Sequence, residues 1–354
     1  MKSRKFKNFL FVVSMLPLFT SCMVGRFVWY NFSDITDHKI FPARNLPKST
    51  QPFRFVEAQR TNSLGKVSLT ILDSLVEANN SVAFLIIRND SLLFEKYYQG
   101  YEANSTVASF SAAKSYTSAL IGAALADGYL KSVDEKIITY LPELKDKKDF
   151  DKITIKHLLQ MTSGIKANES YYNPFGQAAH LYYGRNLRAY IKRLKVDDEP
   201  GTQFAYRSIN TQLLGLIVER ATGKQLTAYL NDRIWSKLGP EYNASWSIDK
   251  KDNGLEKTFC CLNAKARDFA KFGRLYLNKG NWNGEQILPA SWIETSTRPE
   301  KAEGSVYYYR YQWWMTRLGY EASGLHGQYI FVCPEKNLIV VRLGKREGDI
   351  PWDA

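Results

Sequence analysis

Histidine is scarce in this chain, which has four among its 354 residues, and no G-x-S-x-G segment occurs in the sequence. Many serine enzymes with a histidine base expose their nucleophile in such a segment, so a serine–histidine triad is poorly supported. Solenoid or propeller repeats and Pro/Gly/Ser-rich linkers are also absent. These absences argue against repeat architectures and against two independent halves.

Cysteine is equally scarce, with four residues, and no C-x-x-C or Cys/His spacing typical of zinc sites is present. The sequence therefore implies no metal and no organic cofactor. Cys260 and Cys261 are adjacent and poorly placed to bond each other. We expect them to be small buried residues, and a bridge from Cys333 is the lesser alternative.

Runs of consecutive Lys and Arg interleaved with aromatic residues are missing, although the formal net charge is +13. A solvated basic surface near anionic lipid is favoured over nucleic-acid binding. The chain is 45% hydrophobic and 14% aromatic, enough to bury a large core. We expect one globular domain with an inserted lobe.

Residues 1–22 have the pattern of an export signal: four basic residues precede an apolar run from Phe9 to Phe19, which ends in Thr20-Ser21-Cys22. The ending resembles a bacterial lipobox, in which Cys22 would be lipidated and begin the mature protein; an uncleaved anchor is the alternative. We expect an exported, membrane-anchored lipoprotein that faces the periplasm of a Gram-negative bacterium. Residues 23–70 are expected to form an extended arm that carries little chemistry.

Strand patterns stand toward both ends of the chain and helical patterns lie between them. Hairpins are predicted over 82–88 with 91–98, and over 329–332 with 338–343. Helices are predicted over 111–130, 153–161 and 211–221. This order predicts an α/β fold: a sandwich in which an antiparallel sheet from both chain ends is flanked by helices, with a mainly helical lobe inserted at about 130–250.

The segment Ser111-Ala-Ala-Lys114 offers a route to serine chemistry without histidine. Residues three apart at the start of a helix share a face, so the Lys114 amine can reach the Ser111 hydroxyl. Burial in an apolar helix would lower the pKa of this lysine and allow it to act as the base. The helix N-terminus would also direct an N–H group at the developing oxyanion. The alternative interpretation is an ordinary helix start with a surface lysine.

Further landmarks follow this segment in a specific order. They are Ala126-Asp127-Gly128-Tyr129-Leu130, Tyr140-Leu141-Pro142-Glu143, His157-Leu-Leu-Gln-Met-Thr162-Ser163-Gly164, Pro200-Gly201-Thr202, Tyr206-Arg207-Ser208, Ala266-Arg267-Asp268 and His326-Gly327. In this combination the chain resembles the serine β-lactamase-related family, which includes class C β-lactamases and penicillin-binding proteins. The resemblance implies a β-lactamase/transpeptidase-like domain over 71–354.

Within that family a Tyr-x-Asn triplet places a phenol beside the serine–lysine pair, and Tyr206-Arg207-Ser208 stands at the matching position. The resemblance implies that Tyr206 passes the proton from Ser111 to the leaving group. Ser208 replaces the asparagine, which makes a penicillin-like substrate less suitable. The stretch from Tyr206 to Gly215 is instead similar to 6-aminohexanoate-dimer hydrolases, which cleave small linear amides.

The last motif of the family lies on a strand beside the site, and Leu325-His326-Gly327-Gln328 is the matching segment. The resemblance implies substrate contacts from His326, Gly327 and Ser208 and a second oxyanion donor from the strand backbone. We thus expect a serine hydrolase that cleaves small amides or esters through an acyl-enzyme on Ser111. The alternatives are a β-lactamase or D-amino-acid peptidase acting on peptidoglycan-like substrates, and a non-catalytic binding module on the same fold.

Overall fold

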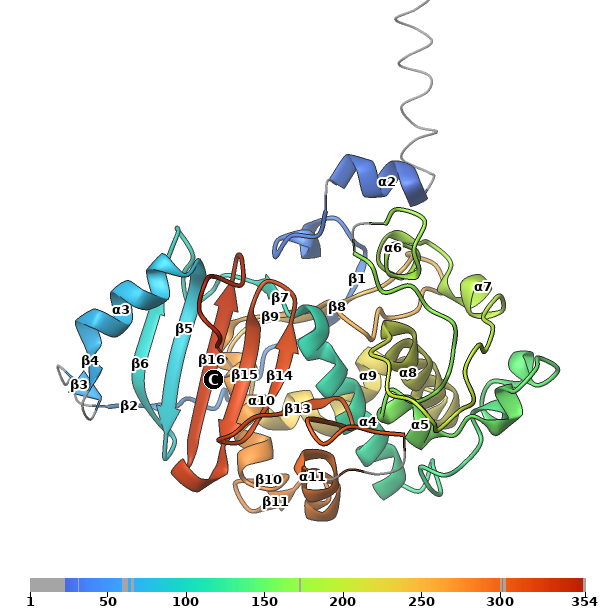
Figure 1. Ribbon diagram of the computed structural model, residues 1–354. Coiled ribbons are helices and arrows are strands. Elements are labelled where there is room, and N and C mark those ends of the chain that lie inside the picture. Colours follow the sequence, from blue (N-terminus) through green and yellow to red (C-terminus); the bar gives the residue numbers. More distant parts are fainter. Residues whose placement is uncertain are drawn as a thin grey trace, which may run out of the picture.

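An eight-stranded sheet forms one side of the molecule (Figure 1). Its strand order is β12-β13-β14-β15-β16-β5-β6-β2, and every neighbouring pair is antiparallel except β2 with β6. The strands are β2 (Val56–Glu57), β5 (Ser81–Arg88), β6 (Ser91–Tyr97), β12 (Tyr309–Arg310), β13 (Trp313–Met315), β14 (Tyr320–Gly324), β15 (Gln328–Cys333) and β16 (Leu338–Gly344). Because β16 pairs with β5, the two chain ends meet in one sheet, which confirms the predicted fold class.

The computed structural model describes residues 23–352 with the exception of 31, 59–62, 65–66, 172, 300 and 302–303. The expected export signal and Cys22 therefore lie outside the described residues. Among the residues described, no helix combines the length and apolar character needed to cross a membrane.

Both predicted hairpins form, and their turns explain why. Asn89 and Asp90, between β5 and β6, have φ angles of 51° and 60°, the left-handed pair that matches the twist of a two-residue hairpin. Asn337, before β16, has a φ of 48°. Asparagine and aspartate tolerate this conformation better than most residues do, so these polar residues allow the chain to reverse between the two strands of each hairpin.

Helices cover both faces of the sheet. On one face α3 (Leu69–Ala78) places Val76 against Phe84 and Phe94. The other face packs against α10 (Ala266–Leu277), where a side chain at Gly273 would collide with Ile339 of β16. Strand residues therefore alternate between two apolar layers, as the period of a β-strand requires.

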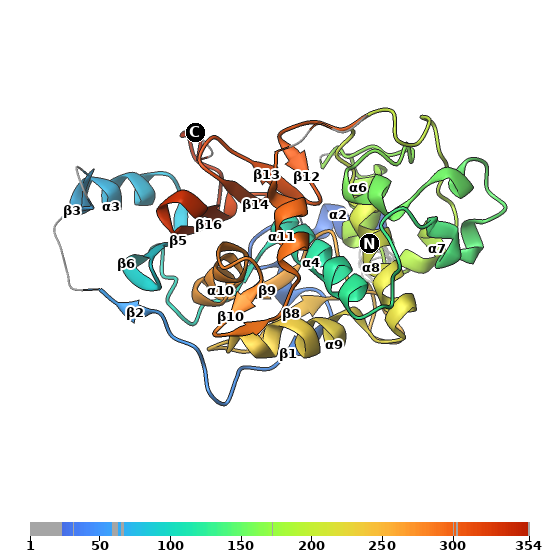
Figure 2. The same ribbon diagram turned by 90° about the horizontal axis from the view of Figure 1, so that it is seen from below.

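The inserted lobe is mainly helical, as predicted. It contains α5 (Ile155–Leu159), α6 (Gln177–Tyr183), α7 (Leu187–Ile191), α8 (Ser208–Thr222) and α9 (Leu226–Leu230), with short helical turns η3 (Ile137–Thr139), η4 (Pro142–Leu144), η5 (Phe150–Lys152), η6 (Asn231–Trp235) and η7 (Ser236–Leu238). The helix α4 (Ala113–Ala126) is buried over most of its circumference and packs on both α8 and β14. Figures 1 and 2 show α4 between the sheet and the lobe.

A second, four-stranded sheet connects the N-terminal segment to the body. Its order is β1 (Ala43–Leu46), β8 (Ala244–Ser247), β9 (Leu262–Ala264) and β7 (Val107–Ala108). The prediction of an extended arm is wrong for its first part, because α2 (Met23–Tyr30) is a helix that packs against α6. The remaining elements are η1 (Asp37–Lys39), β3 (Ser63–Leu64), β4 (Val67–Ser68), η2 (Phe110–Ala112), β10 (Asn281–Trp282), β11 (Glu285–Gln286), α11 (Ala290–Thr297) and η8 (Pro334–Lys336).

Candidate active site

Ser111 and Lys114 meet where β7 leads through η2 into α4. Nζ of Lys114 lies 3.0 Å from Oγ of Ser111 and donates a hydrogen bond to the carbonyl oxygen of Phe259 at 2.8 Å. Ser111 is partly exposed, whereas Lys114 is buried. Phe110, just before the serine, has a φ of 45°, which is costly for an aromatic residue and is often found where a chain holds a functional group in place.

Burial lowers the pKa of Lys114 to about 7, and the negative charge of Glu169 opposes part of this shift. The helix that carries Lys114 has no acidic residue in its first turn. A large fraction of the Lys114 amines is therefore neutral near pH 7, and a neutral amine can accept the proton of a serine hydroxyl. The surface-lysine interpretation of this segment is wrong.

Tyr206 completes this group from the segment that precedes α8. Nζ of Lys114 lies 5.1 Å from the centre of the Tyr206 ring, and the neighbouring Ser111 side chain acts on the pKa of the Tyr206 phenol. Burial raises the pKa of Tyr206 well above its ordinary value, so the phenol keeps its proton. The ring packs against Tyr309 and Trp314 at centroid distances of 5.7 and 5.4 Å.

Ser208 is the first residue of α8 and is buried. Its backbone N–H donates to Oε2 of Glu169 at 3.1 Å. Burial and the nearby Glu169 charge raise the pKa of Tyr171, and a hydrogen bond with Ser208 partly offsets this effect. Sequence reasoning missed Glu169, because it lies in an irregular loop that no motif describes.

The end of β14 lies against the turn that carries Ser111, called the nucleophile turn below. A side-chain carbon at Gly324 would lie 2.3 Å from the carbonyl oxygen of Ser109 and 3.1 Å from the backbone nitrogen of Ser111. Only glycine allows this approach. Gly324 is thus the glycine that faces Ser111. Gly327, which the sequence analysis placed in the family motif, comes three residues later.

His326 and Gly327 form the turn between β14 and β15, with φ angles of 66° and 76°. Nε2 of His326 and the carbonyl oxygen of Ser33 are 2.9 Å apart, and the His326 ring packs against Phe110. The carbonyl oxygen of Gly327 accepts a hydrogen bond from Nη1 of Arg342 at 2.7 Å. The structure therefore places His326 beside the nucleophile turn and Gly327 behind it.

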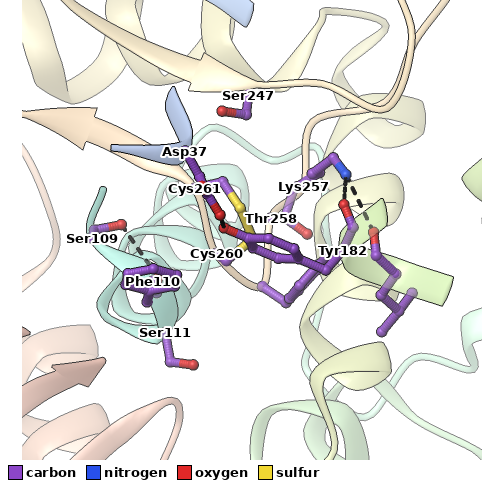
Figure 3. Close-up of a disulfide and its surroundings, with 12 residues drawn as sticks. Asp37, Ser109, Phe110, Ser111, Tyr182, Ser247, Lys257, Thr258, Cys260 and Cys261 are labelled. Atoms are coloured by element: carbon purple, nitrogen blue, oxygen red, sulfur yellow. Dashed lines mark hydrogen bonds between the residues drawn. A yellow bond between two sulfur atoms is a disulfide. The ribbon is translucent and has the colours of Figure 1, made fainter. Parts of the chain in front are cut away.

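Cys260 and Cys261 form a disulfide, so the expectation that they would stay unpaired is wrong. The backbone of Cys261 is left-handed, with a φ of 72°, and this tight turn brings the two side chains to one side. Figure 3 shows the disulfide beside Tyr182, with Phe110 and Ser111 nearby. Cys333 is free and buried, so the alternative bridge from Cys333 does not form.

A cavity of about 240 Å³ opens beside Ser111. It is lined by Phe27, Phe32, Ser33, Phe110, Ser111, Tyr171, Ala178, Ala179, Tyr182, Tyr183, Ser208, Phe259, Cys260, Leu325 and His326. Three of these residues belong to the N-terminal segment, for which we predicted little chemistry. Phe27, Phe32 and Ser33 nevertheless form part of the cavity wall, a contribution that the sequence analysis did not anticipate.

Comparison with known proteins supplies a context for this geometry. The profile of the family described as Beta-lactamase matches residues 71–351. The 6-aminohexanoate-dimer hydrolase of Paenarthrobacter ureafaciens is 27% identical over 302 residues, which cover 77% of this chain and 74% of that protein.

Solved structures share the fold. A Bacillus anthracis protein with the provisional name 6-aminohexanoate-dimer hydrolase superposes with a TM-score of 0.78 at 26% identity, covering 90% of this chain and 89% of its own. A penicillin-binding protein from Bacillus halodurans gives a TM-score of 0.62 at 18% identity, covering 79% of this chain and 94% of its own. The second likeness concerns the fold alone.

Proposed function

The chain belongs to the beta-lactamase family, and from that premise we propose that it hydrolyses small amides or esters through an acyl-enzyme on Ser111. The observation that carries this proposal is the 3.0 Å separation between Nζ of Lys114 and Oγ of Ser111. The buried lysine has a pKa of about 7, so it can take the serine proton at neutral pH. A hydroxyl with a base in reach is the minimum that nucleophilic catalysis requires.

In the acylation step, neutral Lys114 accepts the Ser111 proton as Oγ attacks the carbonyl carbon of the substrate. The carbonyl π bond opens, and its electron pair moves onto oxygen. The backbone N–H of Ser111 and the end of β14 are the proposed donors to this oxyanion, since Gly324 brings that strand against the nucleophile turn.

Breakdown of the tetrahedral intermediate needs a proton for the leaving group. Tyr206 keeps its proton and lies beside Ser111 and Lys114, so it is placed to give its proton to the departing amine or alcohol and to regain one from Lys114. Water then attacks the acyl-enzyme with the same residues in reverse roles, which releases the acid and restores Ser111. The proposed catalytic residues are therefore Ser111, Lys114 and Tyr206, and Ser208 and His326 are proposed to contact substrate.

The mechanism is tested by intact-mass spectrometry after incubation with a fluorophosphonate and, separately, with p-nitrophenyl acetate. Wild type is compared with Ser111→Ala and Lys114→Ala. We expect one adduct that is lost in Ser111→Ala and forms far more slowly in Lys114→Ala. A folded wild-type protein that gains no adduct on Ser111 would contradict the mechanism and favour a binding module. Faster turnover of nitrocefin than of linear amides and esters would favour a β-lactamase.

We also propose that the protein is an exported lipoprotein held at a membrane through Cys22. Helix α2 begins at the next residue, Met23, and its Val28 and Trp29 side chains are 68% and 61% exposed. Exposed apolar and aromatic residues next to an anchor suit the surface of a bilayer. Expression of Cys22→Ala in the host should move the protein from the membrane fraction to the soluble one. Unchanged membrane association would contradict a lipid anchor on Cys22.

A further inference from the structure

The cavity beside Ser111 has a mainly apolar wall, whereas the name of the relative from Paenarthrobacter ureafaciens refers to a substrate that carries an amino group. We propose that this cavity binds an uncharged aliphatic acyl group. The protein would then prefer esters and amides of apolar, medium-length acids to those whose acyl group ends in an ammonium. This inference rests on the proposed hydrolase function and names the substrate class for the same site.

The walls of the cavity are predominantly apolar. Phe27 and Phe110 are buried, as are Ala178 and Ala179 of α6, and Phe259 stands beside the disulfide. Apolar surface removed from water favours binding in proportion to its area. Each methylene group that enters such a cavity should multiply kcat/KM by about four, the equivalent of about 0.8 kcal/mol.

Two of the polar groups in the wall already have partners. Oη of Tyr182 donates to Oδ2 of Asp37 at 2.6 Å, and Nε2 of His326 is 2.9 Å from the carbonyl oxygen of Ser33. An acyl chain therefore does not have to satisfy these groups. A saturated chain offers no hydrogen bonds and needs none from these two groups, whereas Oη of Tyr183 in the same wall has no partner among the described residues.

No aspartate or glutamate is among the described residues that line the cavity. The nearby Asp37 accepts from Tyr182, and Glu169, which does not line the cavity, accepts from the backbone of Ser208 through Oε2, while its buried Oε1 has no partner among the described residues. Lys114 stands at the same site, and Lys257 lies behind Tyr182, with Nζ 5.7 Å from the centre of its ring. An ammonium drawn into this cavity would lose water without gaining a carboxylate in the wall, which is costly.

The position of Tyr206 indicates which half of the substrate enters the cavity. Tyr206 is not among the residues that line it, and its ring packs instead against Tyr309 and Trp314. Since Tyr206 is the proposed donor to the leaving group, that group lies toward the two aromatic residues. The acyl group is left to occupy the cavity.

The test measures kcat/KM of the full chain for p-nitrophenyl acetate, butyrate, hexanoate and 6-aminohexanoate. We expect a rise of about fourfold per methylene from acetate to hexanoate, and a value for 6-aminohexanoate at least roughly tenfold below that for hexanoate. The last two esters have the same chain length and leaving group, so they differ mainly in the terminal ammonium.

Ala179→Leu fills part of the cavity from α6 and should lower the hexanoate-to-acetate ratio by roughly tenfold or more. Ala228→Leu is the matched control, because Ala228 is exposed on α9 and does not line the cavity; it should keep the wild-type ratio. Equal values for all chain lengths, or a preference for 6-aminohexanoate, would overturn this inference while Ser111 still reacts with fluorophosphonate. If no ester is turned over and no adduct forms, the proposed function fails, and this inference fails with it.

Discussion

The carbonyl oxygen of Phe259 accepts a hydrogen bond from Nζ of Lys114 at 2.8 Å, next to the disulfide between Cys260 and Cys261. This bond occupies one N–H of the amine, and the serine oxygen lies 3.0 Å away on another side. The turn that contains the disulfide therefore orients the proposed base as well as forming part of the cavity wall.

The ionisation of Lys114 should control the pH dependence of acylation. Since burial lowers the pKa of Lys114 to about 7, the neutral and active form increases as the pH rises through that value. We expect kcat/KM for an ester to rise about tenfold per pH unit below pH 6 and to level off above pH 8. His326→Gln is the control, because His326 is the histidine that lines the cavity. Loss of the inflection in that variant would contradict the role of Lys114.

Removal of the Tyr206 hydroxyl should slow amide cleavage more than cleavage of an activated ester. An amine leaves poorly without a proton, whereas p-nitrophenolate leaves readily as an anion. Tyr206→Phe keeps the ring that packs on Tyr309 and Trp314, so the fold should persist. We expect a loss of about 10²- to 10⁴-fold in kcat for a linear amide. An equal loss for p-nitrophenyl acetate would show that Tyr206 does not act on the leaving group.

Gly324→Ala should impair acylation, because the new methyl group would lie 2.3 Å from the carbonyl oxygen of Ser109. The end of β14 must then move away from Ser111, and the oxyanion loses a donor. A fall of about 10²- to 10³-fold in kcat is expected from steady-state kinetics. Gly284→Ala is the comparison: no atom lies within 4 Å of the added carbon, and the strain that a φ of 96° imposes on alanine falls in the turn between β10 and β11. If both variants keep wild-type kcat, β14 does not supply a donor.

Reduction of the disulfide should slow the reaction of Ser111 with fluorophosphonate. The turn holds Phe259, whose carbonyl oxygen accepts a hydrogen bond from Nζ of Lys114. It also holds Leu262, whose carbonyl oxygen accepts a hydrogen bond from the Ser109 backbone N–H at 2.9 Å. A looser turn would displace the Lys114 amine, and a displacement of about 1 Å can lower the reaction rate roughly 10²-fold. Cys260→Ser should reproduce the effect of the reductant. Cys333→Ser should not, because Cys333 is free and belongs to β15. Equal rates in Cys260→Ser and wild type would contradict the positioning role.

The hairpins and the main helices follow from local sequence patterns, and the structure confirms them. Strands β5 and β6 and the helices α4 and α8 arise from residues close in sequence, where periodicity and turn chemistry decide the conformation. Lys114 could be placed near Ser111 for the same reason, since a helical turn separates the two residues.

Features that depend on contacts distant in sequence were missed. Gly324 lies against the turn that carries Ser111, whereas His326 and Gly327 form a left-handed turn that a strand pattern cannot reveal. The wall formed by Phe27 and Ser33 depends on α2 docking against α6. A left-handed backbone at Cys261 likewise allows a disulfide that adjacent positions alone argue against.

The family match begins at residue 71, yet Phe27, Phe32 and Ser33 form part of the cavity wall. Part of the proposed acyl pocket is thus encoded outside the stretch that carries Ser111, Lys114 and Tyr206. If the cavity holds the acyl group as proposed, exchange of the first 33 residues between relatives should change which acid is accepted while Ser111, Lys114 and Tyr206 stay untouched. A shortened version that starts at the family boundary would keep the nucleophile and lose one side of its substrate pocket.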